Sequence, residues 1–202
     1  MAEVWLETDE CEDVLSSVRH CSVSFGLAET DLHAFKWVIL SLHSALQGSC
    51  VCHLVGTAGP LGATTKRNAT EWCVYYAAKV DEQVSRPKTK IAELPELLKR
   101  IRKENSAGDG SQGSEIQLTD SDLQWWKRTH DRMRNQFVHF EPMGWSIELS
   151  GIPELVLVTS RIIKEIESNG WAFRHMSDEW RCTLCEEIRN LETRARDWVF
   201  KG

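Results

Sequence analysis

The residues best suited to chemistry in this 202-residue chain lie in one stretch, MRNQFVHFEPMGW at positions 133–145. Arg134 stays charged at any working pH and presents a fork of donors that matches phosphate oxygens. His139 can exchange a proton near neutral pH. Such a pair can cleave RNA without a metal. The imidazole can take the proton from a ribose 2′-hydroxyl or protonate the leaving oxygen. The guanidinium can stabilise the extra negative charge on the phosphoryl group in the transition state. Asn135 follows the arginine directly and can orient the histidine or the phosphate.

The spacing of this pair sets a geometric condition. Five residues correspond to roughly 140° around an α-helix and about 7.5 Å along it, so Arg134 and His139 of one regular helix do not face the same point. They converge if the helix frays at His139, or if two copies of the chain pair about a two-fold axis. In a homodimer the site would then be composite.

The pattern also has a structural interpretation. Requiring an asparagine after the arginine lowers the chance occurrences of Arg-x4-His expected in a chain of this composition from roughly 0.5 to roughly 0.01. The alternative is nevertheless that Arg134 makes a surface ion pair at a helix end and that His139 packs against Trp145. The sequence leaves both interpretations open.

Four further residues are candidates for lining a cleft near Arg134. His43 and Gln47 lie one turn apart on a predicted helix, His130 lies one turn before the arginine, and Trp145 follows the motif. Tryptophan rings commonly hold the bases of single-stranded RNA. The structural alternative is that the polar residues are satisfied at a helix interface and that the tryptophan belongs to the core or to an interface.

The cysteines do not predict a metal site. Cys182 and Cys185 form a C-x-x-C with His175 seven residues earlier, but zinc sites usually need a second such pair. The remaining ligands would be Cys50, Cys52 and His53, on a different predicted helix. Seven cysteines without a signal peptide favour reduced thiols in a cytoplasmic protein over a disulfide framework. We therefore expect neither a metal nor another cofactor.

The hydrophobic spacing predicts helices and no sheet. A long helix is expected at 29–55, where Leu32, Phe35, Ile39, Leu42 and Leu46 recur every three or four residues. A short helix from Val4 to Arg19, broken at 22–26, precedes it. A Gly/Ser-rich loop is expected at 104–118 and an extended connector at 143–153. The other predicted helices are 70–84, 91–103, 119–140, 153–168 and 177–200.

These elements predict an all-α fold, a helical bundle with an additional C-terminal helix. We expect an acidic N-terminal extension at 1–28, a helical domain at 29–168 and a C-terminal helical extension at 169–202. The helix at 119–140 carries the motif and should end near His139, because Pro142 disfavours helix at the residue before it.

Composition limits the classes of function. Hydrophobic residues make up 42% of the chain and charged residues 27%, as in soluble globular proteins. No apolar run reaches the roughly 18 residues that a membrane span requires. The acidic N-terminus is unlike a signal or transit peptide. The net charge of −6 argues against broad coating of nucleic acid, but it leaves room for a local basic cleft because six acids lie within the first thirteen residues. The predicted helix at 91–103 ends in a basic cluster of Lys99, Arg100, Arg102 and Lys103.

The segment RNQFVH at 134–139, at the end of a predicted helix in an all-α chain, resembles the Arg-x(4–6)-His motif of HEPN domains. An asparagine after the arginine is a form favoured in that superfamily. SLHSALQG at 41–48 and FVHFEPMGWSIELSGIP at 137–153 are similar to segments in one group of uncharacterised bacterial HEPN-like proteins. The resemblance covers roughly residues 30–168 and is most specific at 134–153.

The resemblance implies a bundle that dimerises with the motifs of two protomers facing each other. Active members are metal-independent RNA endonucleases that serve as toxins or in defence against phage. Arg134 and His139 are then the expected catalytic residues and Asn135 their polar helper, with single-stranded RNA, a second copy and an antitoxin protein as expected partners. Other HEPN domains are inactive, so the alternative is a non-catalytic module that binds RNA, a nucleotide or a protein, or that serves dimerisation alone.

Overall fold

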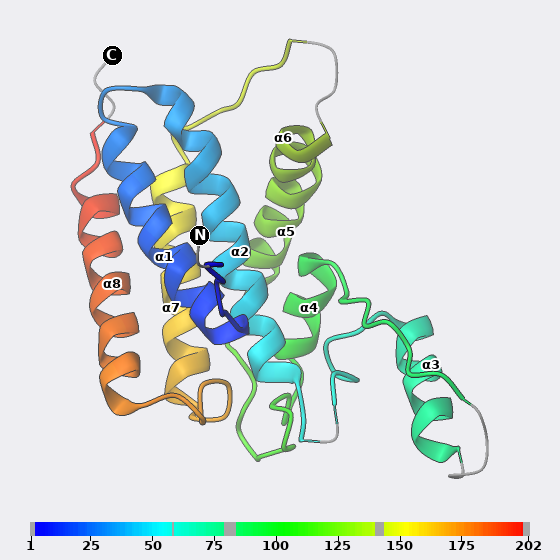
Figure 1. The fold of residues 1–202 in the computed structure, drawn as a ribbon. Coiled ribbons are helices and arrows are strands. Elements are labelled where there is room, and N and C mark those ends of the chain that lie inside the picture. Colours follow the sequence, from blue (N-terminus) through cyan, green and yellow to red (C-terminus); the bar gives the residue numbers. More distant parts are fainter. Residues whose placement is uncertain (1–2, 58, 79–83, 140–143, 200–202) are drawn as a thin grey trace.

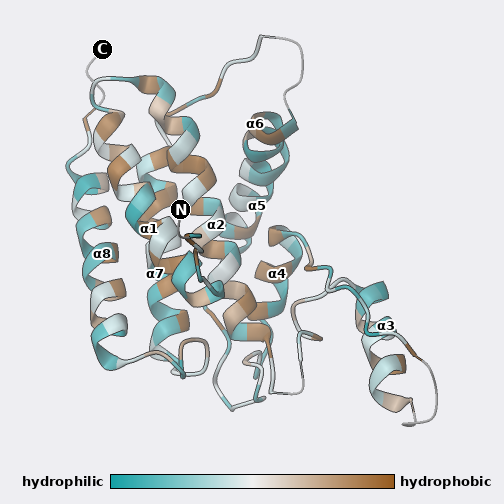
Figure 2. Cartoon of the chain, viewed as in Figure 1, coloured by the Kyte–Doolittle hydropathy of each residue, from teal (hydrophilic) through white to brown (hydrophobic). Residues whose placement is uncertain are grey.

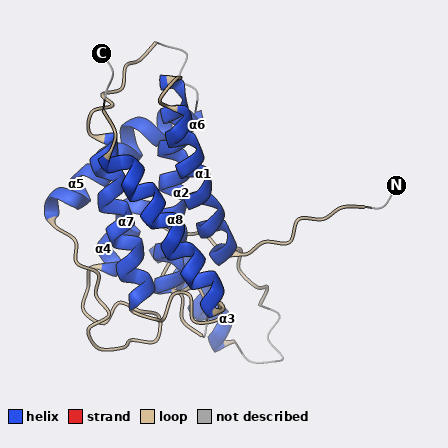
Figure 3. Cartoon of the chain, turned by 90° about the vertical axis from the view of Figure 1, so that its left-hand side faces the viewer, coloured by secondary structure: helices blue, strands red, loops and turns tan. Residues whose placement is uncertain are grey.

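Four long helices pack side by side and enclose the hydrophobic core (Figure 1). They are α1 (Glu10–Leu27), α2 (Phe35–Leu54), α7 (Ile152–Ser168) and α8 (Asp178–Arg196). In this computed structural model, α1 contacts α2 and α8, and α7 contacts the same two helices. The structure describes residues 3–57, 59–78, 84–139 and 144–199, and over this part of the chain no strand forms (Figure 3). The predicted all-α bundle is therefore confirmed.

Helix α2 lies at the centre of this arrangement. Its predicted apolar stripe is buried from Phe35 onward, and Ile39 and Leu46 are fully inaccessible to solvent. Leu32, which was expected on the same stripe, is instead 59% exposed. It lies in a short 3-10 turn (Leu32–Ala34) that precedes α2, and so it does not follow the spacing of that helix. Asp31 caps that turn by accepting the N–H of His33 at 2.9 Å.

Helix α1 is longer than the sequence indicated. The predicted break at residues 22–26 is wrong, since the helix continues to Leu27. Burial explains the difference: the ring of Phe25 packs edge-on against Phe35 and against Trp198, with centroids 5.9 and 5.0 Å apart. Tertiary packing of this kind outweighs the low helix propensity of serine and glycine. The start was also misplaced, because Asp9 caps the helix by accepting the N–H groups of Cys11 and Glu12.

Two shorter helices extend from the end of α2. Helix α4 (Leu94–Ile101) packs four buried residues against α2, as the 91–103 pattern predicted. Helix α3 (Lys66–Ala77) starts four residues before the predicted 70–84 helix, because Thr65 caps it. It stands away from the bundle in Figure 1. Residues 79–83, which the prediction included, lie outside the described residues.

The motif is carried by a composite helix. The predicted 119–140 helix is divided into α5 (Asp120–Arg128), a π-helical segment (Thr129–Arg134) and α6 (Asn135–His139). Thr119 and Asp122 cap it reciprocally, so the predicted start is confirmed. The backbone N–H of Asn135 donates to the carbonyl of His130, five residues earlier, which defines the π turn. The described part ends at His139, and Phe140 lies outside it.

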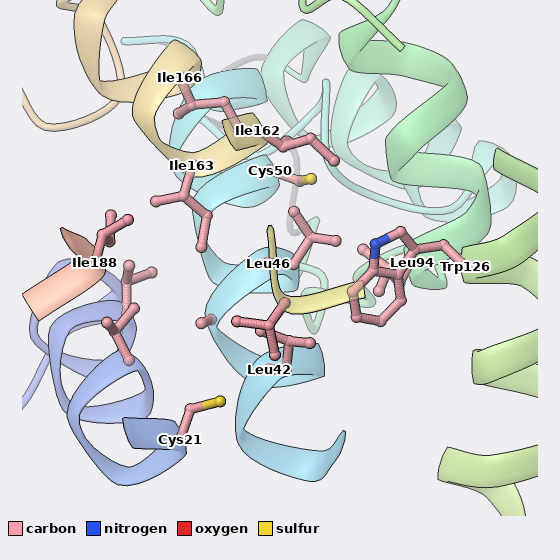
Figure 4. Close-up of a cluster of buried hydrophobic side chains, with 14 of the residues drawn as sticks. Cys21, Leu42, Leu46, Cys50, Leu94, Trp126, Ile162, Ile163, Ile166 and Ile188 are labelled. Atoms are coloured by element: carbon pink, nitrogen blue, oxygen red, sulfur yellow. The ribbon is translucent and has the colours of Figure 1, made fainter. Parts of the chain in front are cut away.

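The apolar side chains of six helices meet in one core. Figure 2 shows the hydrophobic positions turned inward between α1, α2 and α7, with hydrophilic positions outside. Figure 4 shows Leu42, Leu46 and Cys50 of α2 in the middle of this cluster, with α7 on one side and Trp126 of α5 on the other. None of the helices in the described ranges combines the length and the apolar character that a membrane crossing requires.

Candidate functional site

A pocket of about 360 Å³ brings the motif arginine together with α1 and α2. Arg134 and Val138 line it from the motif helix, and Ile91 lines it from the segment before α4. Glu10 and Asp13 line it from the first turns of α1. Helix α2 contributes Leu40, His43, Ser44, Gln47, Gly48 and Val51.

Arg134, the last residue of the π-helical segment, contributes a positive charge to this pocket. It is half-buried, and its Nη1 donates a hydrogen bond to Oδ1 of Asn135 at 2.9 Å. Among the described residues the guanidinium forms no ion pair with a carboxylate. The surface ion pair of the structural interpretation is therefore not present in this part of the chain, and most of the guanidinium donors are available to an anion.

A buried pair of histidines lies behind Arg134. Nε2 of His43 and Nδ1 of His130 are 3.0 Å apart, and the two rings stack with centroids 5.2 Å apart. Burial, then the charges of His130 and Arg134, lowers the pKa of His43 to about 3. Burial and Arg134 also lower the pKa of His130, against the opposing effect of Glu93. The pair is therefore neutral near pH 7, with one ring donating to the other.

Glycine 48 brings the acidic start of α1 over this pocket. A Cβ at Gly48 would lie only 2.7 Å from Cγ2 of Val14, so only glycine allows the two helices to approach this closely here. The contact is extended by a hydrogen bond from Ser44 Oγ to Oδ2 of Asp13 at 3.2 Å. Glu10 and Asp13 were not predicted as site residues. Their signal in the sequence is the three-residue spacing, which places both on one face of a helix.

His139 is not brought to the same pocket. It is exposed at the end of α6, and the lining described for the pocket includes the preceding residue, Val138, but not His139. Within one chain the π-helical segment thus leaves the expected separation of Arg134 and His139 in place. The pair can act on one phosphate only if a second element or a second copy supplies the missing residue.

Trp145 lies in a different groove. Its ring packs edge-on against Phe137, with centroids 4.7 Å apart, and it is 37% exposed. The groove, of about 590 Å³, is also lined by Lys36 and Trp37 at the start of α2. Of the four predicted cleft residues, His43 and Gln47 therefore line the Arg134 pocket, and His130 lies within hydrogen-bond distance of His43. The fourth, Trp145, does not line this pocket.

The other sequence features acquire structural explanations. Cys182 is exposed and Cys185 is half-buried on α8, and no group of three potential metal ligands occurs among the described residues. All seven cysteines are free, with the sulfur atoms of Cys11 and Cys52 3.9 Å apart. In the basic cluster, Arg100 donates to the carbonyls of Gly62 and Thr64, which ties it to the protein itself.

No family model matches this chain, and comparison with curated proteins and with solved structures gives no significant match either. The resemblance to HEPN domains therefore remains a prediction from the motif.

Proposed function

We propose that this protein is a metal-independent endoribonuclease of the HEPN type, acting on single-stranded RNA as a homodimer. Arg134 is proposed to bind the scissile phosphate, and His139 of a second copy to move the proton. Asn135 holds the guanidinium through the 2.9 Å hydrogen bond. No metal or other cofactor takes part in this reaction.

The observation that carries the proposal is the Arg134 guanidinium, which forms no ion pair with any of the described residues. An arginine that is half-buried, fixed by an amide and free of carboxylate partners among the described residues is arranged for a phosphate. The histidines behind it are neutral near pH 7, so the charge at this point of the pocket belongs to Arg134. His139 is exposed and can therefore meet a phosphate held by another molecule.

In the proposed reaction, His139 accepts the proton of the 2′-hydroxyl while the 2′-oxygen attacks phosphorus. Arg134 stabilises the negative charge on the equatorial oxygens. The bond from phosphorus to the 5′-oxygen breaks, and that oxygen takes up a proton from the imidazolium or from water. The products are a 2′,3′-cyclic phosphate and a 5′-hydroxyl.

The test is cleavage of an end-labelled single-stranded RNA in EDTA. We expect wild-type protein to leave 2′,3′-cyclic phosphate ends, and His139→Ala or Arg134→Ala to lower the rate by about 100-fold or more. His20→Ala is the matched control, because His20 is also exposed but lies on α1, outside the pocket lining. Cleavage that persists in the His139→Ala variant would overturn the assignment.

A toxin or phage-defence role belongs to the same proposal, with an antitoxin protein as partner. It predicts that induced expression of the wild-type chain in bacteria arrests growth and that the His139→Ala chain does not. Equal arrest by both chains would separate the growth effect from RNA cleavage.

The second candidate is a non-catalytic module that binds RNA, a nucleotide or a protein. The separation of His139 from the Arg134 pocket within one chain favours it. On this hypothesis Arg134→Ala weakens binding of a nucleotide and neither protein cleaves RNA.

A further inference from the structure

The Arg134 pocket is lined by charges of both signs that form no ion pair with one another among the described residues. Glu10 and Asp13 face it from α1, and Arg134 faces it from the motif helix. Among the described residues, none of the three forms an ion pair, although Asp13 accepts a hydrogen bond from Ser44. A ligand that fits this arrangement carries an anionic group at one end and hydrogen-bond donors at the other.

We propose that the pocket binds a guanine nucleotide, with the phosphate at Arg134 and the base edge at Glu10, Asp13 and Gln47. This inference rests on the proposed function in one respect: in an RNA substrate, the bound guanosine would select the position of cleavage. The free nucleotide would bind through the same contacts.

The choice of guanine follows from the pattern of donors and acceptors. An ionised carboxylate only accepts hydrogen bonds, and its two oxygens match two adjacent donors. The Watson–Crick edge of guanine presents two such donors, N1–H and N2–H₂, next to the acceptor O6. Gln47, which lines the same pocket from α2, has an amide donor for O6. Adenine presents an acceptor at N1 where guanine has a donor, so it would place a lone pair against a carboxylate.

The remaining lining is suited to a flat ring. Leu40, Val51, Ile91 and Val138 supply apolar side chains between the polar groups. The volume of about 360 Å³ is at the lower end of the range of roughly 300–1,000 Å³ in which small molecules bind. The pocket therefore has room for one nucleotide, and the bases on either side of it would lie outside.

The close approach of α1 to α2 places the carboxylates at this ring. A Cβ at Gly48 would lie 3.7 Å from the backbone carbonyl oxygen of Glu10, so the first turn of α1 lies directly against the α2 residue that follows Gln47. The Asp13–Ser44 hydrogen bond fixes the next turn at 3.2 Å. Glu10 and Asp13 of α1 and Gln47 of α2 thus line the same pocket.

The first experiment is calorimetric titration with guanosine 3′-monophosphate, against the adenosine, cytidine and uridine monophosphates. We expect wild-type protein to prefer the guanine nucleotide by about tenfold or more, the discrimination typical of a bidentate base contact. The double variant Glu10→Gln/Asp13→Asn should lose this preference, and Arg134→Ala should weaken all four nucleotides alike. Glu12→Gln is the matched control, since Glu12 lies between the two acids in sequence but outside the pocket lining.

A second variant tests the proposal even if the double variant disturbs the folding of α1. Gln47→Leu leaves α1 and every charge unchanged and should also reduce the preference for guanine. Equal binding of the four nucleotides by the wild type, binding of none of them, or an unchanged preference in Gln47→Leu and in the folded double variant would overturn the proposal.

An RNA cleavage assay distinguishes the guanine-binding proposal from the ribonuclease proposal. The substrates are single-stranded RNAs with one guanosine in an otherwise adenosine strand, and the same strand without guanosine. Cutting of both at equal rates would overturn guanine selection and leave the ribonuclease standing. Selective binding of guanosine monophosphate with no cutting would overturn the ribonuclease and support a free guanine nucleotide as the ligand.

Discussion

Helix α2 and the composite motif helix lie side by side but are built on different principles. Helix α2 buries most of its length, with Ile39 and Leu46 fully inaccessible. In α6, the end of the motif helix, no residue is buried. Burial therefore accounts for the sequence of α2, whereas the polar residues of α6 are not required by the core. They can therefore be substituted at little cost in stability.

The largest expected effect tests the buried side of this comparison. Leu46→Ala removes a fully buried side chain from the core cluster, and should lower the free energy of unfolding by about 2–5 kcal/mol. Val138→Ala, at a 41% exposed position of α6, should change it by less than about 0.5 kcal/mol. Urea denaturation followed by circular dichroism measures both. Similar losses in the two variants would mean that α6 is part of the core.

A second effect comes from the buried histidine pair that joins the two helices. The folded pKa of His43, about 3, lies below the ordinary value of 6.5, so its contribution to stability is present above pH 6.5 and is lost as the pH falls toward 3. Between pH 7 and pH 5 the loss is about 2 kcal/mol. Denaturation at the two pH values should show that His43→Gln loses less on acidification than the wild type. The exposed His20→Gln should behave like the wild type, and an identical pH response in all three proteins would exclude a buried neutral His43.

A third effect concerns the contact between α1 and α2. Gly48→Ala should lower the free energy of unfolding by about 1–3 kcal/mol, because the new methyl group overpacks against Val14. The higher helix propensity of alanine should offset this loss by up to about 1 kcal/mol. In a Val14→Ala background the same substitution should cost less, because the methyl group that it meets is gone. The measurement is a double-mutant cycle of unfolding free energies. Additive effects would mean that the helices do not touch at Gly48.

The smallest expected effect is on the exposed side. His139→Ala should change the free energy of unfolding by less than about 0.5 kcal/mol, since the side chain is exposed and no described residue forms a hydrogen bond or ion pair with it. Thermal denaturation of the two proteins at equal concentration tests this. A large loss would assign His139 a structural role and weaken the case for catalysis.

The same contrast explains what the sequence predicted. The 3.6-residue spacing of apolar side chains located α4, α7 and α8 to within four residues at each end and α2 to within six, because burial determines that spacing directly. It failed at residues 22–26 of α1, where Phe25 and its aromatic partners stabilise a helix that local propensity does not favour. The π-helical segment left no signal in the spacing either, since it alters the hydrogen bonding of a helix that remains a helix.

The site was predictable only in part. The positions of Arg134, His43 and Gln47 around one pocket follow from two predicted helices meeting at their apolar stripes. The part played by Glu10 and Asp13 depends on the close approach at Gly48, a tertiary contact that spacing along the chain does not encode. Whether Arg134 and His139 act together depends on a second copy of the chain, which no single-chain pattern describes.

The central claim is that Arg134 and His139, which do not share a pocket within one chain, act on the same phosphodiester. The most direct measurement is cleavage of labelled single-stranded RNA in EDTA by an equimolar mixture of the Arg134→Ala and His139→Ala variants, beside each variant alone and the wild type. In a mixed dimer one of the two composite sites keeps both residues, so about a quarter of wild-type activity should return after random exchange. Intact RNA with the wild type, or full cleavage by either variant alone, would contradict the account, and a mixture as inactive as its components would contradict the composite site.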